Sequence, residues 1–386
     1  MNRTFAEINL DALVHNYNII KKSTKAKVLC AVKANGYGHG VYYVARALEE
    51  SGADYFAVAD VDEGVELRRC GITKPCVILG YSDEPERVME FDLYPSVTDV
   101  NVARKLSDAA VKCGKMVKIH IAVDTGMSRI GFKANNMNDV EASLRDIKKI
   151  SELPNLRIDG IFSHFTTADC EDGSFTKLQF ERFSKLTSML ENAGVDVGLK
   201  HICNSAAVML YPEMHLDMVR PGIVLYGLKP SDYIAGKNFG FEPVMELKTT
   251  VTRITELYDG EYVGYGNTYQ TDGKKVIATV GAGYADGYFR ALSNKGYALC
   301  GNEKINIAGR ICMDQCMFDV TNVNNIKVGD PVILFGRNPS ADEIAGLAGT
   351  IGYELVCAVS RRVPRVYYRN GKVIGSVNPI LENIVR

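Results

Sequence analysis

The fold is decided by Val28-Leu29-Cys30-Ala31-Val32-Lys33-Ala34-Asn35-Gly36-Tyr37-Gly38-His39-Gly40. Five apolar residues of the kind found in buried strands run directly into Lys33, and three glycines then alternate with Tyr37 and His39. A lysine at the end of a buried parallel strand packs poorly, but it can reach into a pocket above the sheet. Burial there lowers the pKa of an amine and makes it a nucleophile or a Schiff-base former. The ordinary alternative is a lysine whose ammonium group lies in solvent. The residues in the rest of the chain have to distinguish between these two interpretations of Lys33.

Short apolar runs alternate with helical patterns along the first part of the chain. We expect strands at residues 28–34, 55–59, 76–80, 93–97, 117–123, 157–162, 200–203 and 218–225. We expect helices between them at residues 41–50, 61–70, 100–113, 137–150, 177–192 and 205–210. Strands that alternate with helices in this number predict a parallel (β/α)8 barrel of the TIM type. An open, doubly wound sheet is the competing topology, because the last two predicted strands are short or indistinct.

A different pattern follows residue 236. Alternating segments at residues 249–257, 275–280, 304–311, 317–320 and 331–335 indicate antiparallel strands, with one helix near residues 341–347. Asn370-Gly371 between two apolar runs is a strong hairpin signal, because both central residues of a type I′ turn need a positive φ. We therefore divide the chain into a barrel over residues 1–236 and a β-rich domain over residues 237–386. A strand at 4–9 and a helix at 11–22 could belong to either domain.

Composition narrows the class of protein. The 386 residues carry a formal net charge of -1 and are 46% hydrophobic, which is ordinary for a soluble globular enzyme. This balance gives no reason to expect a nucleic-acid or membrane partner. The sequence has neither the pattern of a signal peptide nor an apolar run long enough to span a bilayer. Ten cysteines without a C-x-x-C pair predict free thiols in a reducing cytoplasm and no metal site.

Polar residues follow several of the predicted strands. The working residues of a (β/α)8 barrel cluster at the carboxyl ends of its strands, so these residues form a candidate site. They are Lys33, the loop from Asp124 to Arg129, His164, Ser205, and the segment from Arg220 to Ile223. The loops after the last two strands commonly hold a phosphate through backbone N–H groups. A lysine beside a phosphate cradle suggests pyridoxal phosphate as the cofactor. Each residue alone has a structural explanation, and only their shared placement indicates a site.

The whole chain resembles the bacterial alanine racemases. The most specific matches are Val32–Gly40, Val123–Gly131, His201–Ala207, Gly283–Gly287 and Gly309–Gln315. The resemblance implies a barrel that binds pyridoxal phosphate, a following β domain, and interconversion of L- and D-alanine to supply D-alanine for peptidoglycan. It also implies a homodimer whose active sites are shared between the subunits, with a small amino acid as substrate.

The resemblance assigns two catalytic bases. It implies that Lys33 holds the cofactor as an internal aldimine and acts on one face of the substrate, while Tyr284 acts on the other face. Inversion at Cα requires such a pair, because the proton leaves from one face and returns to the other. A phenol needs nearby positive charge or hydrogen-bond donors to act as a base. We expect His164, with Arg220 behind it, to supply them.

Other residues match the family's cofactor and substrate contacts. Arg220 resembles the partner of the pyridine nitrogen, and a guanidinium, which stays protonated, leaves that nitrogen without a proton. The positions that match phosphate contacts are Tyr37, Ser205, Gly222, Ile223 and Tyr353. Arg129 and the backbone of Met313, with Asp314 alongside, match the groups that bind the substrate carboxylate.

Two positions depart from the family pattern. Many members carry a lysine that becomes carbamylated and steadies the substrate-binding arginine, and this chain has Ala122 there. Arg129 therefore needs another partner, and we expect a side chain from elsewhere or a bound anion such as chloride. Gly281-Ala282 stand where a proline is frequent, which loosens the approach to Tyr284.

Two other functions remain open from the sequence. A serine racemase of the vancomycin-resistance type would use the same bases, because an apolar pocket rejects a hydroxyl only weakly. Tyr353 argues mildly for alanine, since it should crowd the side-chain pocket. A pyridoxal phosphate decarboxylase, or a cofactor-carrying protein without catalysis, is disfavoured by Tyr284 and by the carboxylate-binding Arg129.

Overall fold

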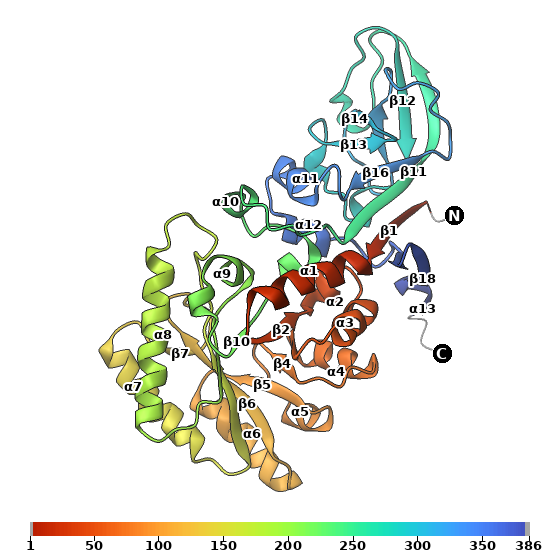
Figure 1. Cartoon of the computed structure of the whole chain (residues 1–386). Helices are drawn as coiled ribbons and strands as arrows, with labels where there is room; N and C mark the ends of the chain where they lie inside the picture. Colours follow the sequence, from red (N-terminus) through yellow and green to blue (C-terminus); the bar gives the residue numbers. More distant parts are fainter. Residues whose placement is uncertain (1–2, 383–386) are drawn as a thin grey trace.

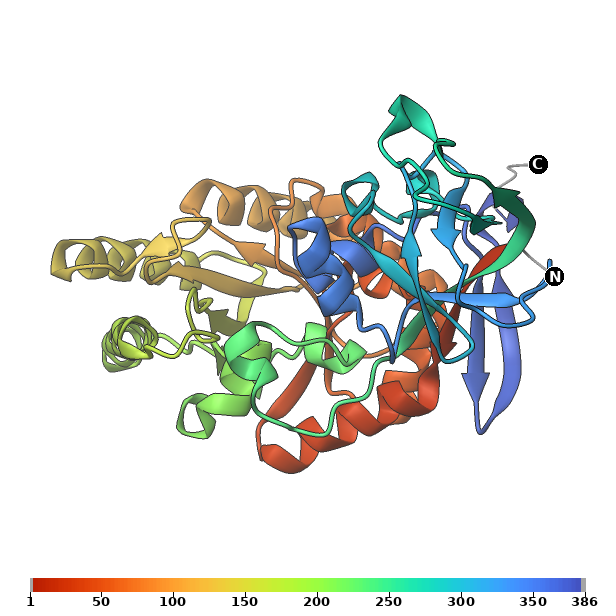
Figure 2. The same ribbon diagram turned by 90° about the horizontal axis from the view of Figure 1, so that it is seen from above.

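A barrel and a β-rich domain make up the protein, whose computed structural model describes residues 3–382 (Figure 1). The helices surround the barrel strands, and the β-rich domain stands to one side of them (Figure 2). The outer bounds predicted for the two domains, residues 1 and 386, lie outside the described residues.

Parallel strands form the barrel in the order β10-β2-β3-β4-β5-β6-β8-β9. They are β2 (Lys27–Ala31), β3 (Tyr55–Val58), β4 (Cys76–Ile78), β5 (Leu93–Val97), β6 (Val117–Asp124), β8 (Leu156–Phe162), β9 (Leu199–His201) and β10 (Met218–Val219), and the short β7 (Phe132–Lys133) pairs with β6. The Asp217 N–H donates to the Lys200 carbonyl (3.1 Å) and so links β10 to β9. The predicted (β/α)8 barrel is therefore confirmed, and the open-sheet alternative is wrong.

Helices cover the outside of the barrel. They are α1 (Leu10–Ser23), α3 (Val41–Glu50), α4 (Val61–Arg69), α5 (Pro85–Glu90), α6 (Val100–Cys113), α7 (Met137–Ser151), α8 (Ser174–Asn192) and α9 (Ser205–Leu210), with α2 (Lys33–Tyr37) at the rim and α10 (Asp232–Ala235) after the barrel. Side chains cap several N-termini: Asp99 accepts from the Val102 N–H at 3.1 Å, and Asn204 accepts from the Ala207 N–H at 3.1 Å. Such caps satisfy N–H groups that have no partner within the helix. Gly114, at a φ of 62°, ends α6 in the left-handed conformation that favours glycine.

The second domain is built on one sheet in the order β12-β15-β14-β13-β16-β11-β1-β17-β18. Its strands are β1 (Thr4–Asn9), β11 (Met245–Leu257), β12 (Lys275–Val280), β13 (Tyr297–Cys300), β14 (Glu303–Ile307), β15 (Cys316–Asp319), β16 (Pro331–Phe335), β17 (Arg365–Arg369) and β18 (Lys372–Val377). Its helices are α11 (Ala341–Ala348), α12 (Gly352–Cys357) and α13 (Pro379–Glu382). Every pairing is antiparallel except that of β1 with β17. The mostly antiparallel second domain is therefore confirmed.

The N-terminal strand β1 does not follow the predicted division at residue 236. β1 pairs with β11 and β17 of the second sheet, although the division assigned its residues to the barrel. The next element, α1, packs on the barrel helix α3. The chain thus starts in one domain and continues into the other, which ties the two together.

Lys33 and β13 are two places where the structure differs from the sequence expectation. The first barrel strand ends at Ala31, so Lys33 belongs to the short turn α2 rather than to the strand. The strand β13 was not predicted, because all its residues are buried and it lacks the alternation that marks a half-exposed strand.

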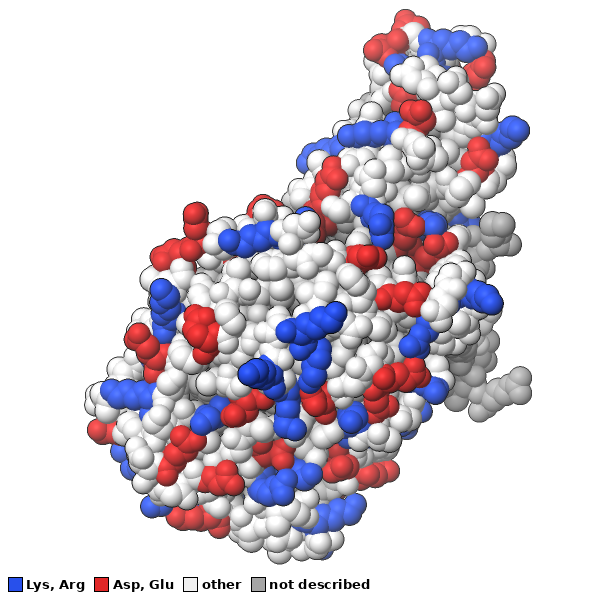
Figure 3. All heavy atoms as spheres, viewed as in Figure 1, with Lys and Arg blue, Asp and Glu red and all other residues white. Residues whose placement is uncertain are grey.

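Charges of both signs are interspersed on the surface. Figure 3 shows Lys and Arg beside Asp and Glu over the face drawn, without a broad patch of one sign on that face. Within residues 3–382, no helix has the length and apolar character that crossing a lipid bilayer requires.

Candidate active site

Lys33 begins a left-handed turn at the carboxyl end of β2. Ala34 and Asn35 have φ values of 52° and 54°, a conformation that costs a non-glycine residue roughly 1–2 kcal/mol. Glu63 of α4 holds this turn, since its carboxylate accepts from the Ala34 N–H (2.6 Å) and the Ala59 N–H (2.7 Å). The strained turn therefore depends on contacts from outside itself.

The second domain also holds this loop. The buried Arg365 guanidinium donates to the Gly38 carbonyl from both Nε (3.1 Å) and Nη2 (3.0 Å). Tyr367 donates to the His39 carbonyl (3.2 Å). A side chain at Gly38, which has a φ of 79°, would meet the Val356 carbonyl. The position of Lys33 is thus fixed by both domains.

Four basic side chains, Lys33, Arg129, His164 and Arg220, lie within electrostatic range of one another at the barrel mouth. Burial, and then the charge of Arg129, lower the pKa of Lys33, while the Glu63 carboxylate opposes them. Burial lowers the pKa of His164 well below its usual value, and Arg220, Arg129 and Lys33 lower it further. His164 is therefore neutral at neutral pH. The excess of positive charge makes this pocket suited to anionic groups.

Arg220 lies at the centre of this cluster and is 4% exposed. Its guanidinium donates to the carbonyls of Ser163 (2.6 Å) and Ile202 (3.1 Å) and to Nδ1 of His201 (2.9 Å) and His164 (3.2 Å). Burial lowers its pKa to about 10, which leaves it protonated at neutral pH. The cation is thus surrounded by neutral acceptors that orient it.

Small and hydroxyl residues form a cradle beside the cluster. The Gly222 N–H donates to Oγ of Ser205 (2.8 Å), and Ile223 begins the short helix η2 (Ile223–Tyr226). A Cβ atom at Gly222 would lie 2.7 Å from the Tyr37 hydroxyl, so glycine keeps this space open. The rings of Tyr37 and Tyr353 lie 6.4 Å apart. Burial raises the pKa of both phenols, which therefore remain hydrogen-bond donors.

Tyr284 and Met313 lie together on the second domain. Tyr284 begins the short helix η4 (Tyr284–Asp286), and its N–H donates to the Cys312 carbonyl (3.0 Å). The next N–H, of Ala285, donates to the Met313 carbonyl (3.0 Å). Both side chains are exposed, Tyr284 by 41% and Met313 by 53%. Within residues 3–382, no hydrogen bond, ion pair or ring contact joins either of them to Lys33.

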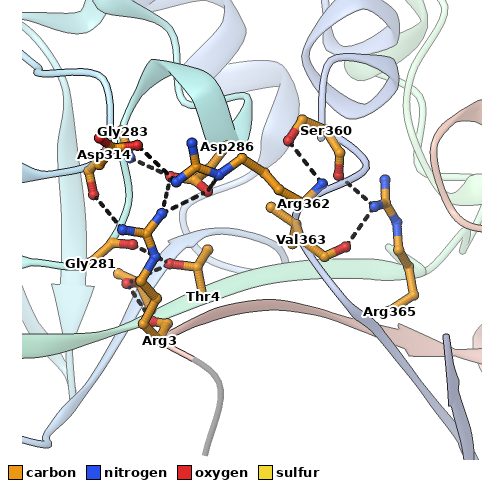
Figure 4. A network of polar contacts seen from close by, with 11 residues as sticks. Arg3, Thr4, Gly281, Gly283, Asp286, Asp314, Ser360, Arg362, Val363 and Arg365 are labelled. Atoms are coloured by element: carbon orange, nitrogen blue, oxygen red, sulfur yellow. Dashed lines mark hydrogen bonds and ion pairs between the residues drawn. The ribbon is translucent and has the colours of Figure 1, made fainter. Parts of the chain in front are cut away.

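The buried carboxylate of Asp286 helps to hold the loop of Tyr284 against the loop of Met313 (Figure 4). Asp286 accepts from the Gly283 N–H (2.9 Å) and pairs with Arg3 (3.3 Å) and Arg362 (3.1 Å). Arg362 also pairs with Asp314 (2.8 Å). The Asp314 carboxylate is therefore engaged in the network that supports the loop of Met313.

Arg129 has no acidic partner in the described part of the chain, where no carboxylate oxygen lies within 4.0 Å of its guanidinium. The loop that carries it is shaped by Asp124, which accepts from the Ser128 N–H (2.9 Å). A small cavity of about 20 Å³ lies beside Ala122, Arg129 and His164. A volume of this size is enough for one water-sized guest.

The sequence reasoning missed several residues that shape the pocket. His201 lies in the His201–Ala207 motif, but nothing in that motif points to a role for its side chain. Glu63 and Arg365 act through backbone groups, and no spacing in the sequence points to such contacts. Asp286 lies in the Gly283–Gly287 motif, but nothing in the sequence indicates that its carboxylate is buried.

Comparison with known proteins identifies the relatives of the chain. Residues 8–230 match the family model of the alanine racemase N-terminal domain, and residues 244–367 match that of the C-terminal domain. An alanine racemase of Clostridium tetani is 45% identical over 382 residues, which are 97% of each chain.

Solved structures agree with this relationship. The structure of alanine racemase from Clostridium difficile 630 has a TM-score of 0.93 and 39% identity, and the match covers 98% of this chain and 99% of that one. The Bacillus anthracis alanine racemase with bound L-Ala-P has a TM-score of 0.90 and 35% identity, with coverage of 99% for both chains. These relatives support alanine racemisation and not the serine alternative. The chain belongs to the alanine racemase family.

Proposed function

We propose that the pocket around Lys33 binds pyridoxal phosphate and alanine, and that Lys33 and Tyr284 exchange the Cα proton on opposite faces of the substrate. The observation that carries the proposal is the convergence of four basic side chains beside a cradle of hydroxyl and glycine residues. When bound, the aldehyde cofactor withdraws electrons from Cα of the attached amino acid and makes its hydrogen acidic.

Residues from both domains would hold the cofactor. The hydroxyls of Tyr37, Ser205 and Tyr353 and the N–H groups of Gly222 and Ile223 would contact the phosphate, and the Gly222 N–H would then turn from Oγ of Ser205, to which it donates here, toward the anion. The Nε–H of Arg220 makes no hydrogen bond within residues 3–382 and is available as a donor to the pyridine nitrogen. Because Arg220 stays protonated, it would leave that nitrogen without a proton.

Each base would be prepared by its surroundings. The lowered pKa of Lys33, caused by burial and by Arg129, favours the neutral amine that can take a proton. Arg220 donates to Nδ1 of His164, so the neutral ring carries its hydrogen on Nε2. That N–H would donate to the oxygen of Tyr284 from the second subunit and orient it for proton transfer.

Tyr284 would reach the substrate from a second subunit. Tyr284 and Met313 are exposed and lie on two loops of the second domain that hydrogen bonds join, yet within residues 3–382 no hydrogen bond, ion pair or ring contact links them to the basic cluster. We propose a head-to-tail homodimer in which these two residues complete the partner's site.

A mixture of Lys33→Ala and Tyr284→Phe chains tests the arrangement. Completion in trans predicts recovery of about one quarter of wild-type activity, since half of the dimers are mixed and each mixed dimer holds one intact site. Completion within one chain predicts no recovery.

The substrate carboxylate would bind between the two subunits. Arg129 supplies a guanidinium, and the Met313 N–H, which has no partner within residues 3–382, supplies a donor. Asp314 would act indirectly, because its carboxylate pairs with Arg362. We propose that an anion such as chloride occupies the cavity beside Ala122 and steadies Arg129 in place of the missing lysine.

Racemisation assays with purified protein test the function. Loss of optical rotation from L-alanine and from D-alanine, faster than from serine, is the expected result. Lys33→Ala should abolish turnover in both directions, and Tyr284→Phe should spare cofactor binding while crippling proton exchange on one face. Carbon dioxide release instead of racemisation would favour the decarboxylase alternative and contradict the proposal.

A further inference from the structure

A line of polar side chains runs through the interior of the barrel, where layers of apolar residues are usual. It starts at Arg220 at the mouth and continues through His201 on β9 and His120 on β6 to Asp159 on β8. Both histidines are 0% exposed. Only the first of these contacts, between Arg220 and His201, belongs to the site described above.

The donors and acceptors along this line have one consistent direction. Arg220 can only donate, so Nδ1 of His201 must accept (2.9 Å), and the His201 hydrogen is on Nε2. That N–H then donates to Nδ1 of His120 (2.9 Å), which places the His120 hydrogen on its own Nε2. Burial lowers the pKa of both rings, so both are neutral.

Asp159 ends the line with a negative charge. Its carboxylate lies 3.7 Å from Nε2 of His120, which has no hydrogen-bond partner in the described chain. It also accepts from Arg157 (2.9 Å) and from the Tyr55 hydroxyl (3.2 Å). Burial alone would raise its pKa, but the hydrogen bonds from Arg157 and Tyr55 oppose burial and help to hold the pKa well below its usual range. The carboxylate therefore favours the His120 tautomer that Arg220 requires from the other end.

The backbone makes room for this arrangement. His120 pairs in register with Gly160 on the neighbouring strand β8, which separates β6 from β9. A Cβ atom at Gly160 would lie 2.6 Å from both Cε1 and Nδ1 of His120. Glycine thus leaves the space through which the His120 ring reaches His201 across the intervening strand.

We propose that His120 is a positioning residue for Arg220: it accepts the His201 hydrogen and, anchored by Asp159, keeps the lone pair of His201 facing the guanidinium. Without an acceptor at position 120, the buried His201 N–H loses its partner and the ring is free to change tautomer. A hydrogen on Nδ1 would then oppose the Arg220 donor. The inference deepens the proposed function, because it rests on Arg220 as the group that meets the cofactor ring.

Two substitutions at position 120 separate this role from simple packing. His120→Phe keeps the bulk of an aromatic ring but removes the acceptor. His120→Asn can place an amide oxygen where Nδ1 stood and so keeps the acceptor. The rings are followed by ¹⁵N spectroscopy of the histidine-labelled holoenzyme, with the absorption of the bound cofactor and with kcat and KM for alanine.

In the wild-type enzyme, His120 and His201 should each show a single neutral tautomer with the hydrogen on Nε2. In H120F, His201 should show mixed tautomers, the cofactor absorption should change, and kcat should fall by about 10-fold or more with a smaller change in KM. H120N should restore the His201 signal and most of the lost rate. If H120F does not fold, Asp159→Leu should release His120 from its single tautomer.

Several results would overturn the inference. They are a hydrogen on Nδ1 of either wild-type ring, an H120F enzyme whose His201 signal and cofactor absorption are unchanged, an H120N enzyme that resembles H120F, or unchanged His120 signals in D159L. The spectra also separate this inference from the proposed function. Wild-type rings that behave as expected in a protein that does not racemise alanine would contradict the proposed function and leave the histidine line intact.

Discussion

Replacing Asp286 tests whether the buried network holds Tyr284 in place. Asp286 is 1% exposed, and its carboxylate accepts from the Gly283 N–H and forms ion pairs with two arginines. Asp286→Ala leaves the buried N–H of Gly283 without a partner, while Arg3 and Arg362, 42% and 30% exposed, can turn to water. Loss of a hydrogen bond to a charged group costs about 1.5–3 kcal/mol, and we expect the variant to lose about that much stability. Breaking a fully buried pair would cost more, about 3–5 kcal/mol.

The same change should reduce catalysis more than it reduces cofactor binding. The lost free energy can act on the equilibrium between ordered and disordered η4. In that case the fraction of molecules with Tyr284 in its working position decreases by roughly 10-fold for each 1.4 kcal/mol lost. Urea unfolding at fixed protein concentration measures stability, and racemisation of both alanine enantiomers measures activity. Asp83→Asn is the matched control, because it removes a carboxylate from an ion pair with Lys105 in which both side chains are exposed. A D286A enzyme with the stability and activity of D83N would refute the reasoning.

Three further predictions concern the pocket. Gly222→Ala should weaken pyridoxal phosphate binding by roughly 10-fold in a cofactor titration, because the new methyl group would meet the Tyr37 hydroxyl. Unchanged affinity would show that this space is not needed. Lys33→Met should stabilise the protein freed of cofactor at neutral pH, since the folded state lowers the lysine pKa and disfavours its charged form. The unfolded chain then binds more protons, so wild-type stability should rise with pH and the advantage of K33M in thermal unfolding should vanish near the usual lysine pKa of about 10.4. An advantage that grows with pH would contradict this sign. Removal of chloride should raise the KM for alanine several-fold if an anion steadies Arg129, and a KM independent of chloride would remove that proposal.

Much of the barrel could be predicted because its strands and helices leave local signals. The apolar runs and the helical patterns between them mark most barrel elements to within a few residues. The strand end at Lys33 was less predictable. Its left-handed turn is stabilised by Glu63 and by the second domain, and such distant contacts outweigh local preference.

The candidate site was only partly predictable for a similar reason. Residues at strand ends, such as His164 and Arg220, gather at one rim because a barrel requires it. The pairing of His201 with His120 was not predictable, since it depends on a glycine in the strand between them. Tyr284 and Met313 could be assigned by family resemblance, but within residues 3–382 no hydrogen bond, ion pair or ring contact joins them to Lys33.

The central claim is that two bases act on opposite faces of alanine. The most direct measurement follows the exchange of the Cα hydrogen with deuterated solvent, separately for L- and D-alanine, in wild-type and Tyr284→Phe enzymes. We predict that Y284F exchanges one enantiomer readily and the other at least about 100-fold more slowly than the wild-type enzyme does. Wild-type exchange rates for both enantiomers in Y284F would contradict the claim.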